Sequence, residues 1–271
     1  MPSHHISSIT IDTFNDVLDR YPPAAPEKLR DLDAQRYDTI PTTFAQRVAS
    51  IEEAHLSKDE VEKLVEWKLK HGTFRPKLLG LVQSNSSSAI DSTTRAAFDL
   101  LPGGKPNTKD ILAALKKLAE LKGIGPATAS LLLSVAAPDS VPFFSDELFR
   151  WCMWDEQGSP GGWQRKIKYN NKEYEELVPK VQALRKRLGE KVRALDIERV
   201  AWVLGNEAID VGDDQVKDDA QEEEKTETTK EEEEVADTKD AEAKPKKGTK
   251  RKAAETKVPA EGTRKSSRTK R

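Results

Sequence analysis

The spacing of apolar residues predicts helices over most of residues 45–211. Ser57 begins a capping box, and apolar side chains then recur with the period of a helix until Gly72 ends it. Further helices are expected at about 78–82, 89–101, 108–118, 126–133, 173–188 and 197–206. No segment shows the alternation with period two that is typical of strands. The sequence therefore predicts an all-α fold.

Shifts in composition divide the chain into three parts. Residues 1–44 carry one short apolar pattern, at 11–18, and are predicted to be a partly helical N-terminal extension. Residues 45–211 are the predicted helical domain. Residues 212–271 hold almost no large apolar side chains, so they cannot bury enough surface to offset the loss of chain entropy. This last part is predicted to be a disordered tail.

The charge of the tail is sorted into two blocks. Residues 213–243 carry 15 acidic and 4 basic side chains, whereas residues 244–271 carry 12 basic and 2 acidic ones. The basic block contains the clusters KPKKGTKRK and TRKSSRTKR, a pattern typical of a bipartite nuclear import signal. We therefore expect a nuclear protein that engages import receptors. A tail that binds nucleic acid without sequence preference, or one that only adds solubility, is the alternative.

The remaining composition excludes several classes of protein. No apolar stretch approaches the ~20 residues of a membrane-spanning helix, so we expect no membrane partner. The N-terminus lacks the apolar region of a secretion signal. Cys152 is the single cysteine, and the four histidines show no metal-ligand spacing. These counts exclude an internal disulfide framework and a four-cysteine zinc or iron–sulfur site, and we expect neither a metal nor another cofactor.

The stretch LKGIGPATA, at residues 121–129, carries the most specific signal in the chain. Two glycines flank one aliphatic residue between two helices, which permits positive φ angles and a close approach of the backbone to a ligand. The N–H groups that begin the second helix lack partners within it and form an anion site that suits a DNA phosphate. A plain helix–turn–helix connection is the alternative. The candidate DNA-binding residues here are Lys122, Gly123, Ile124, Gly125, Pro126 and Ala127.

With this motif the chain resembles the helix-hairpin-helix superfamily of DNA base-excision glycosylases. In that superfamily a loop after the hairpin presents a catalytic aspartate, and Asp146 stands 23 residues after Gly123, at a matching distance. Residues 81–90 resemble a second family segment, whose amide side chains lie near DNA and are here Gln83 and Asn85. The resemblance implies double-stranded DNA as partner, an extruded base as substrate and Asp146 as catalytic residue.

The resemblance covers roughly residues 60–206, and its departures mark a divergent, eukaryotic branch. Family members that cleave the DNA strand carry a lysine two residues after the second hairpin glycine, where this chain has Ala127. A Schiff-base mechanism needs that amine, and Lys122 is not its equivalent. Glu147 and Leu148 follow the aspartate, where a histidine is common in the family. The resemblance therefore implies a monofunctional glycosylase without lyase activity.

Each remaining candidate has a structural alternative. Asp146 could cap the helix expected directly after it, and the amides of Gln83 and Asn85 could cap helices as well. Trp163 and Arg165 lie in a glycine-rich stretch that could stack on a base while holding a phosphate. An ordinary surface loop is the alternative for that stretch.

The sequence thus predicts a nuclear DNA-binding protein that resembles a monofunctional glycosylase. The alternative is a non-enzymatic DNA- or chromatin-binding protein whose glycosylase pocket has degenerated. An open cleft beside Asp146, on the side of the hairpin amides, would favour the enzyme. A cleft filled by Phe143, Phe144 or Trp151 would favour the binding protein.

Overall fold

The computed structural model describes residues 3–50, 54–103 and 105–212, and over these residues the chain forms helices and loops without a strand. The predicted all-α fold class is confirmed. Of the predicted tail at 212–271, residues 213–271 lie outside the described residues. The helices are α1 (Ile11–Leu18), α2 (Tyr21–Ala24), α3 (Arg30–Ala34), α4 (Ile40–Ala49), α5 (Lys58–His71), α6 (Leu78–Gln83), α7 (Ser87–Phe98), α8 (Thr108–Leu118), α9 (Pro126–Ala136), α10 (Asp146–Cys152), α11 (Asn171–Leu188) and α12 (Ala194–Asn206), with short 3-10 turns η1 (Glu27–Leu29) and η3 (Gly162–Gln164) and a π-helical turn η2 (Gln35–Thr39).

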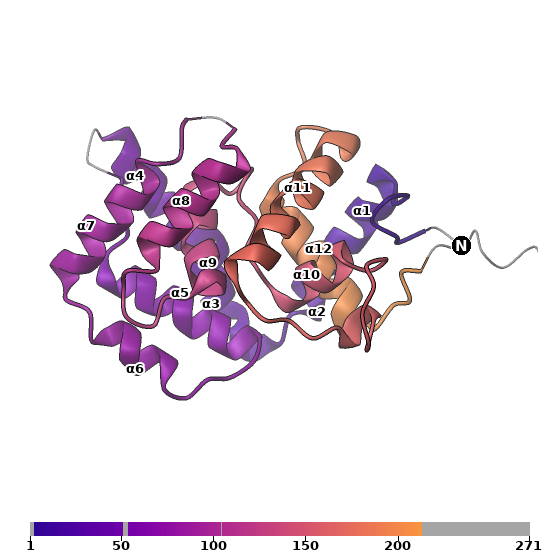
Figure 1. Cartoon of the computed structure of the whole chain (residues 1–271), viewed down its shortest axis with the longest axis horizontal. Coiled ribbons are helices and arrows are strands. Elements are labelled where there is room, and N and C mark those ends of the chain that lie inside the picture. The colour runs from indigo at the N-terminus through magenta and orange to yellow at the C-terminus, as the bar shows by residue number, and fades with distance from the viewer. Residues whose placement is uncertain (1–2, 51–53, 104, 213–271) are drawn as a thin grey trace, which may run out of the picture. The chain divides into compact units, whose positions relative to one another are not determined.

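The helices gather into two groups (Figure 1). In the first group α8 packs between α7 and α9, and α5 packs against α9 and α6. In the second group α12 packs against α1, α10 and α11. The chain passes from one group to the other through the loop that joins α9 to α10, so the hairpin before α9 and Asp146 at the start of α10 belong to different groups.

The N-terminal residues contribute to the cores of both groups, because α1 and α2 pack against α12 whereas α3 and α4 pack against α5 and α9. Phe14 and Val17 are buried in α1, which packs against α12 near the other end of the described chain. Tyr21 and Ile40 are buried as well. The predicted boundary at residues 44 and 45 therefore does not separate two packing units. Residues 3–44 are part of one compact unit with the helices that follow, because their buried apolar side chains belong to the same hydrophobic core.

Capping residues set the helix ends largely as the sequence predicts. The Ser57 hydroxyl accepts a hydrogen bond from the Glu60 N–H at 3.3 Å, and the Glu60 carboxylate accepts one from the Ser57 N–H at 2.8 Å. Helix α5 then ends before Gly72. Helix α8 begins at Thr108, but Asn107 is its cap, because the Asn107 side chain accepts hydrogen bonds from two N–H groups of the first turn. The two capping boxes fix where these two helices of the first group begin.

Candidate functional site

The hairpin connects α8 to α9 and requires glycine at its first position. Gly123 has a φ of 78°, which L side chains rarely adopt. A Cβ added there would lie 3.0 Å from the Cβ of Leu81. Ile124 is buried and anchors the turn, whereas Lys122 and Gly125 are exposed. The hairpin therefore presents its backbone to solvent while one aliphatic side chain fixes it to the core.

Asn85 holds the hairpin from behind. Its side-chain Nδ2 donates to the carbonyl oxygen of Val82 at 2.8 Å and to that of Lys122 at 3.0 Å, and its Oδ1 accepts from the Lys122 N–H at 3.0 Å. Asn85 is buried, so its predicted contact with DNA is wrong. Both polar atoms of the amide have hydrogen-bond partners, which join the end of α6 to the hairpin. Gln83 is exposed and hydrogen-bonds Glu62 at 3.3 Å.

The start of α9 exposes unpaired backbone donors. Gly125 is the N-cap and no side chain caps the helix, while Pro126 has no N–H to offer. Neither the Gly125 N–H nor the Ala127 N–H donates a hydrogen bond within the described part of the chain. No atom lies within 4 Å of a Cβ placed on Gly125. An anion can therefore approach these two donors closely.

A cavity of about 270 Å³ lies between the two groups of helices. The first group lines it with the hairpin and with residues of α5, and the second group lines it with Asp146, Glu147 and residues of α12. The hairpin and the predicted catalytic residue thus share one cavity. Its volume is close to the lower end of the ~300–1,000 Å³ of small-molecule pockets, which suits one planar ring system better than an extended ligand.

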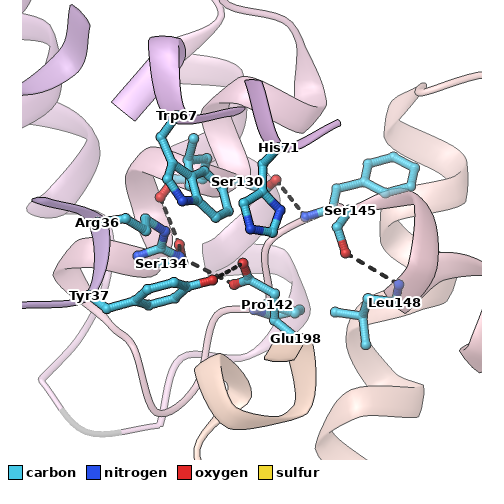
Figure 2. A network of polar contacts seen from close by, with 12 residues as sticks. Arg36, Tyr37, Trp67, His71, Ser130, Ser134, Pro142, Ser145, Leu148 and Glu198 are labelled. Carbon is cyan, nitrogen blue, oxygen red and sulfur yellow. Dashed lines mark hydrogen bonds and ion pairs between the residues drawn. The ribbon is translucent and has the colours of Figure 1, made fainter. Parts of the chain in front are cut away.

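Asp146 is the first residue of α10 and does not cap it. The cap is Ser145, whose hydroxyl accepts a hydrogen bond from the Leu148 N–H at 3.2 Å (Figure 2). Asp146 Oδ1 accepts a hydrogen bond from the Tyr169 hydroxyl at 2.7 Å, and Oδ2 lies 3.3 Å from Arg150 Nη2. The side chain of Asp146 is 25% exposed. The carboxylate is thus held in one orientation at the cavity wall while it stays accessible.

A buried network of charges and phenols forms the floor of the cavity. Figure 2 shows Arg36, Tyr37 and Glu198 directed toward one another below Trp67. Arg36 Nη2 donates to Glu198 Oε2 at 3.2 Å and to the Ser134 hydroxyl at 2.8 Å, and the Tyr37 hydroxyl donates to Glu198 Oε1 at 3.2 Å. Burial raises the pKa of the Glu198 carboxyl, although the Arg36 charge opposes this shift.

His71 lies in an aromatic wall of the same cavity. Its ring stacks on Trp67 with centroids 4.6 Å apart and packs against Trp202 at 5.0 Å. Its Nε2 lies 3.1 Å from the Tyr21 hydroxyl. Burial lowers the pKa of His71, with Asp33 acting in the opposite direction, so the imidazole favours its neutral form. A flat apolar wall with a neutral nitrogen can hold an aromatic ring.

Cationic and acidic side chains stand around the cavity as well. Lys68, Arg75 and Lys168 line it together with Glu147. The Arg75 guanidinium lies 5.5 Å from the centre of the Tyr169 ring, the same ring whose hydroxyl binds Asp146. Burial raises the pKa of the Glu147 carboxyl, which favours its protonated form. The cavity therefore offers both cations for a phosphate and a carboxyl group that can supply a proton.

Trp163 and Arg165 take part in the local packing of their loop, and the predicted contact of this pair with DNA stays a prediction. Trp163 Nε1 donates to the carbonyl oxygen of Ile209 at 2.7 Å, and its ring packs edge-on against Trp154. Arg165 donates to the carbonyl oxygens of Glu156 and Gln157. Neither side chain lines the cavity. The alternative of an ordinary loop describes this stretch better.

The three aromatic residues that could have closed the cavity leave it open. Phe143 and Phe144 lie in its wall, where Phe143 packs against Trp67 and Phe144 stacks on Tyr174 with centroids 5.6 Å apart. Trp151 is fully buried elsewhere, and its Nε1 donates to the carbonyl oxygen of His4 at 3.0 Å. Packing within the core therefore holds all three rings out of the cavity.

Sequence reasoning missed most of the cavity residues. Lys68, His71, Glu147, Glu198 and Tyr169 come from three helices and a loop, and no short motif contains them. The one available signal was the spacing of Lys68 and His71, which places both on the same side of α5 near its C-terminal end. The partners that complete the cavity become neighbours only through the tertiary fold.

Comparisons with models of protein families, with curated proteins and with solved structures find no match to this chain. The resemblance to helix-hairpin-helix glycosylases therefore stays a prediction from the motif. No helix in the described part of the chain is both long and apolar enough to cross a membrane. Within residues 3–50, 54–103 and 105–212, no group of three or more His, Cys, Asp or Glu side chains is arranged to hold a metal ion.

Proposed function

We propose that this chain is a nuclear DNA-binding protein that excises a base from duplex DNA, as a monofunctional glycosylase does. One observation carries the proposal: the unpaired amides of the hairpin and the Asp146 carboxylate face the same cavity. A base must leave the duplex before an enzyme can reach its glycosidic bond, and it then needs a pocket beside the site that holds the backbone. The arrangement supports that sequence of events.

The hairpin would hold the DNA backbone. The N–H groups of Gly125 and Ala127 point from the start of α9, where the helix dipole favours an anion. Lys122 is exposed beside them, and Arg75 and Lys168 stand at the cavity. Such contacts fix the position of the duplex without reading its sequence. This predicts an affinity that falls steeply as the salt concentration rises.

The cavity would hold the extruded base against its aromatic wall. The His71 ring, backed by the buried Trp67 on which it stacks, would form that wall, and Tyr37 and Glu198 line the floor. Stacking of a base on an aromatic side chain is worth about 1–3 kcal/mol. This gain offsets part of the cost of unstacking the base from the duplex.

Asp146 would then stabilise the positive charge that develops on the deoxyribose as the glycosidic bond breaks, while water attacks the sugar carbon. Glu147, which lines the cavity and whose pKa burial raises, would give a proton to the departing base. The hairpin itself supplies no amine, because Ala127 stands at the position of the family lysine. In the proposed excision step the nucleophile is water.

A non-enzymatic DNA-binding protein is the second candidate. The observation in its favour is that both carboxylate oxygens of Asp146 already have partners, the Tyr169 hydroxyl and Arg150. A carboxylate neutralised by these contacts would stabilise a cationic sugar less well. In this case the hairpin would bind DNA and the cavity would hold a base without breaking its bond.

Incubation of the full chain with a panel of damaged duplexes, followed by chemical cleavage of abasic sites, tests the enzymatic proposal. For the base that is excised, Asp146→Asn should lower the single-turnover rate by ~100-fold or more, because ~3 kcal/mol of charge stabilisation is lost. DNA binding should stay within a few-fold of wild type. Asp59→Asn is the matched control, since the Asp59 side chain is 74% exposed on α5.

An Asp146→Asn protein that excises at the wild-type rate would overturn the assignment of Asp146. A wild-type protein that binds duplex DNA but excises nothing from the whole panel would favour the non-enzymatic candidate. The nuclear part of the proposal has its own test. Deletion of residues 213–271 from a fluorescent fusion too large to diffuse through nuclear pores should move it to the cytoplasm, and an unchanged nuclear signal would count against import by the tail.

A further inference from the structure

Lys68 differs from the other lysines of α5 in having no partner. Lys63 pairs with Asp59 at 2.7 Å and Lys70 pairs with Glu66 at 2.6 Å. The Lys68 ammonium forms no hydrogen bond and no ion pair among residues 3–50, 54–103 and 105–212. It lines the cavity, partly buried, on the helix face that also carries His71.

The surroundings of Lys68 favour a neutral amine more than those of a surface lysine do. Burial lowers the pKa of Lys68, and the charge of Arg75 lowers it further, while the charge of Asp146 acts in the opposite direction. Lys68 and Asp146 both line the cavity. A neutral amine is the form of lysine that attacks a carbonyl carbon.

We propose that Lys68 is an amine nucleophile that captures the aldehyde of an abasic deoxyribose in the cavity beside Asp146. The proposal rests on the proposed function, because DNA held at the hairpin must bring the sugar to the cavity. It revises the expectation that the chain lacks lyase activity. Ala127 excludes an amine only at the hairpin, whereas the fold brings a different amine to the cavity from α5.

The chemistry balances without a further reactant. The neutral Lys68 nitrogen adds to the C1′ carbon of the ring-opened sugar, the addition product takes up one proton from solvent, water leaves, and a protonated imine remains. The imine makes the C2′ hydrogen acidic, and its removal by a base expels the phosphate oxygen from C3′, so the strand breaks. Asp146 is the carboxylate placed to take that proton. Water then hydrolyses the imine and frees the lysine.

The positions of the neighbouring groups favour this carbonyl over a free small aldehyde. The hairpin amides and Arg75 suit the phosphates on either side of an abasic sugar. The cavity lined by His71 would be left empty by the excised base. An abasic site held in this way keeps its aldehyde within reach of the amine, and a held carbonyl reacts far faster than a free one.

Reductive trapping on the full chain tests the proposal without requiring any excision. The probe is a duplex with one preformed abasic site, and borohydride reduces the imine to a stable amine that is seen as a protein–DNA adduct on a denaturing gel. Wild type should form the adduct, and mass spectrometry of the digested adduct should place the sugar on Lys68. Lys68→Ala and Lys68→Arg should lower its yield by about tenfold or more, since neither side chain forms an imine. Lys70→Ala, on the exposed side of the same helix, should match wild type.

Binding of the same duplex is measured for every variant by fluorescence anisotropy, together with its thermal stability. If wild type binds the duplex but forms no adduct, or if the sugar is found on Met1 or on another lysine, the proposal for Lys68 is overturned. If Lys68→Arg is folded and still traps as wild type does, it is overturned as well. If wild type does not bind the duplex, the proposed function is contradicted, and the proposal for Lys68, which rests on it, is contradicted as well. An adduct on Lys68 in a protein that excises no base would support Lys68 as the amine nucleophile and would contradict the proposed base excision.

Discussion

The hairpin and the floor of the cavity face the same space but are built in opposite ways. The hairpin is one run of residues, 121–129, and it offers backbone N–H groups at the surface. The floor joins Arg36 to Glu198, which is far from it in the chain, and consists of buried side chains. The first depends on local conformation, and the second depends on the whole fold. Substitutions should therefore affect the two regions in different ways.

Burial makes the floor the more sensitive of the two regions. Arg36 is fully buried, and its Nε and Nη1 atoms have no hydrogen-bond partner in the described part of the chain. Its guanidinium lies 5.3 Å from the centre of the Tyr37 ring and 5.5 Å from that of Trp67. Removing one member of such a pair leaves the other charge buried alone.

The largest expected effect is therefore a loss of stability at the floor. Arg36→Met should lower the free energy of unfolding by about 3–5 kcal/mol, because Glu198 stays buried without its cation. Urea denaturation measures this change. The double variant Arg36→Met/Glu198→Gln should regain a large part of the loss, since it removes both charges. Additive losses in the double variant would show that the two side chains are not energetically coupled.

In the hairpin, the effect of a substitution on stability should depend on the backbone conformation of the residue replaced. Gly123 has a positive φ and close neighbours, whereas Gly125 has neither. Gly123→Ala should cost about 1–3 kcal/mol, because alanine is strained at a φ of 78° and its Cβ meets Leu81. Gly125→Ala should change stability by no more than about 0.5 kcal/mol, since its φ of −96° is ordinary and the space is open. Thermal or urea unfolding of both variants measures the difference. Equal costs would contradict this account of the turn.

DNA affinity should depend on the second glycine although stability does not. Gly125→Asp should weaken binding to an undamaged duplex by about tenfold, ~1.4 kcal/mol, because it places a negative charge beside the phosphate held at α9. Gly125→Asn adds a side chain of the same size without the charge and should have a clearly smaller effect at low salt. If a folded Gly125→Asp protein binds as tightly as wild type, the hairpin does not hold the phosphate.

The same contrast explains how much the sequence predicts. Helix ends follow from local signals such as Ser57 and Gly72, and the glycines of the hairpin are separated by a single residue, so both features can be predicted from the sequence alone. Asn85 shows where such reasoning fails. A loop amide in this segment suggests a DNA contact, but tertiary packing turns it toward Lys122.

The residues of the cavity could not be predicted for the same reason. Glu198 and Tyr37 look like ordinary helix residues in the sequence, and their meeting at 3.2 Å depends on the packing of α12 against the N-terminal turns. The short apolar pattern of residues 1–44 predicts only an extension, yet α1 completes the core beside α12. Long-range contacts leave no local pattern.

The smallest expected effect is a dependence of stability on pH that comes from His71 in the aromatic wall of the cavity. Burial holds the pKa of His71 below its value in the unfolded chain, which is about 6.5, although Asp33 raises it in part. Below about pH 6.5 the unfolded chain therefore binds a proton that the folded chain does not. The free energy of unfolding should then decrease as the pH is lowered, by at most ~1.4 kcal/mol per pH unit.

His71→Gln removes this titrating group while it keeps a polar side chain near the Tyr21 hydroxyl, which lies 3.1 Å from His71 Nε2. The free energy of unfolding is measured for both proteins at about pH 7.5 and at about pH 5.5, where the wild type should lose roughly 1 kcal/mol more than the variant. His4, His5 and His55 are present in both proteins, so their contributions cancel in the comparison. Equal losses in the two proteins would mean that His71 binds its proton as readily in the folded chain as in the unfolded one. The buried wall of the cavity would then accept a charge as easily as the solvent-exposed hairpin does.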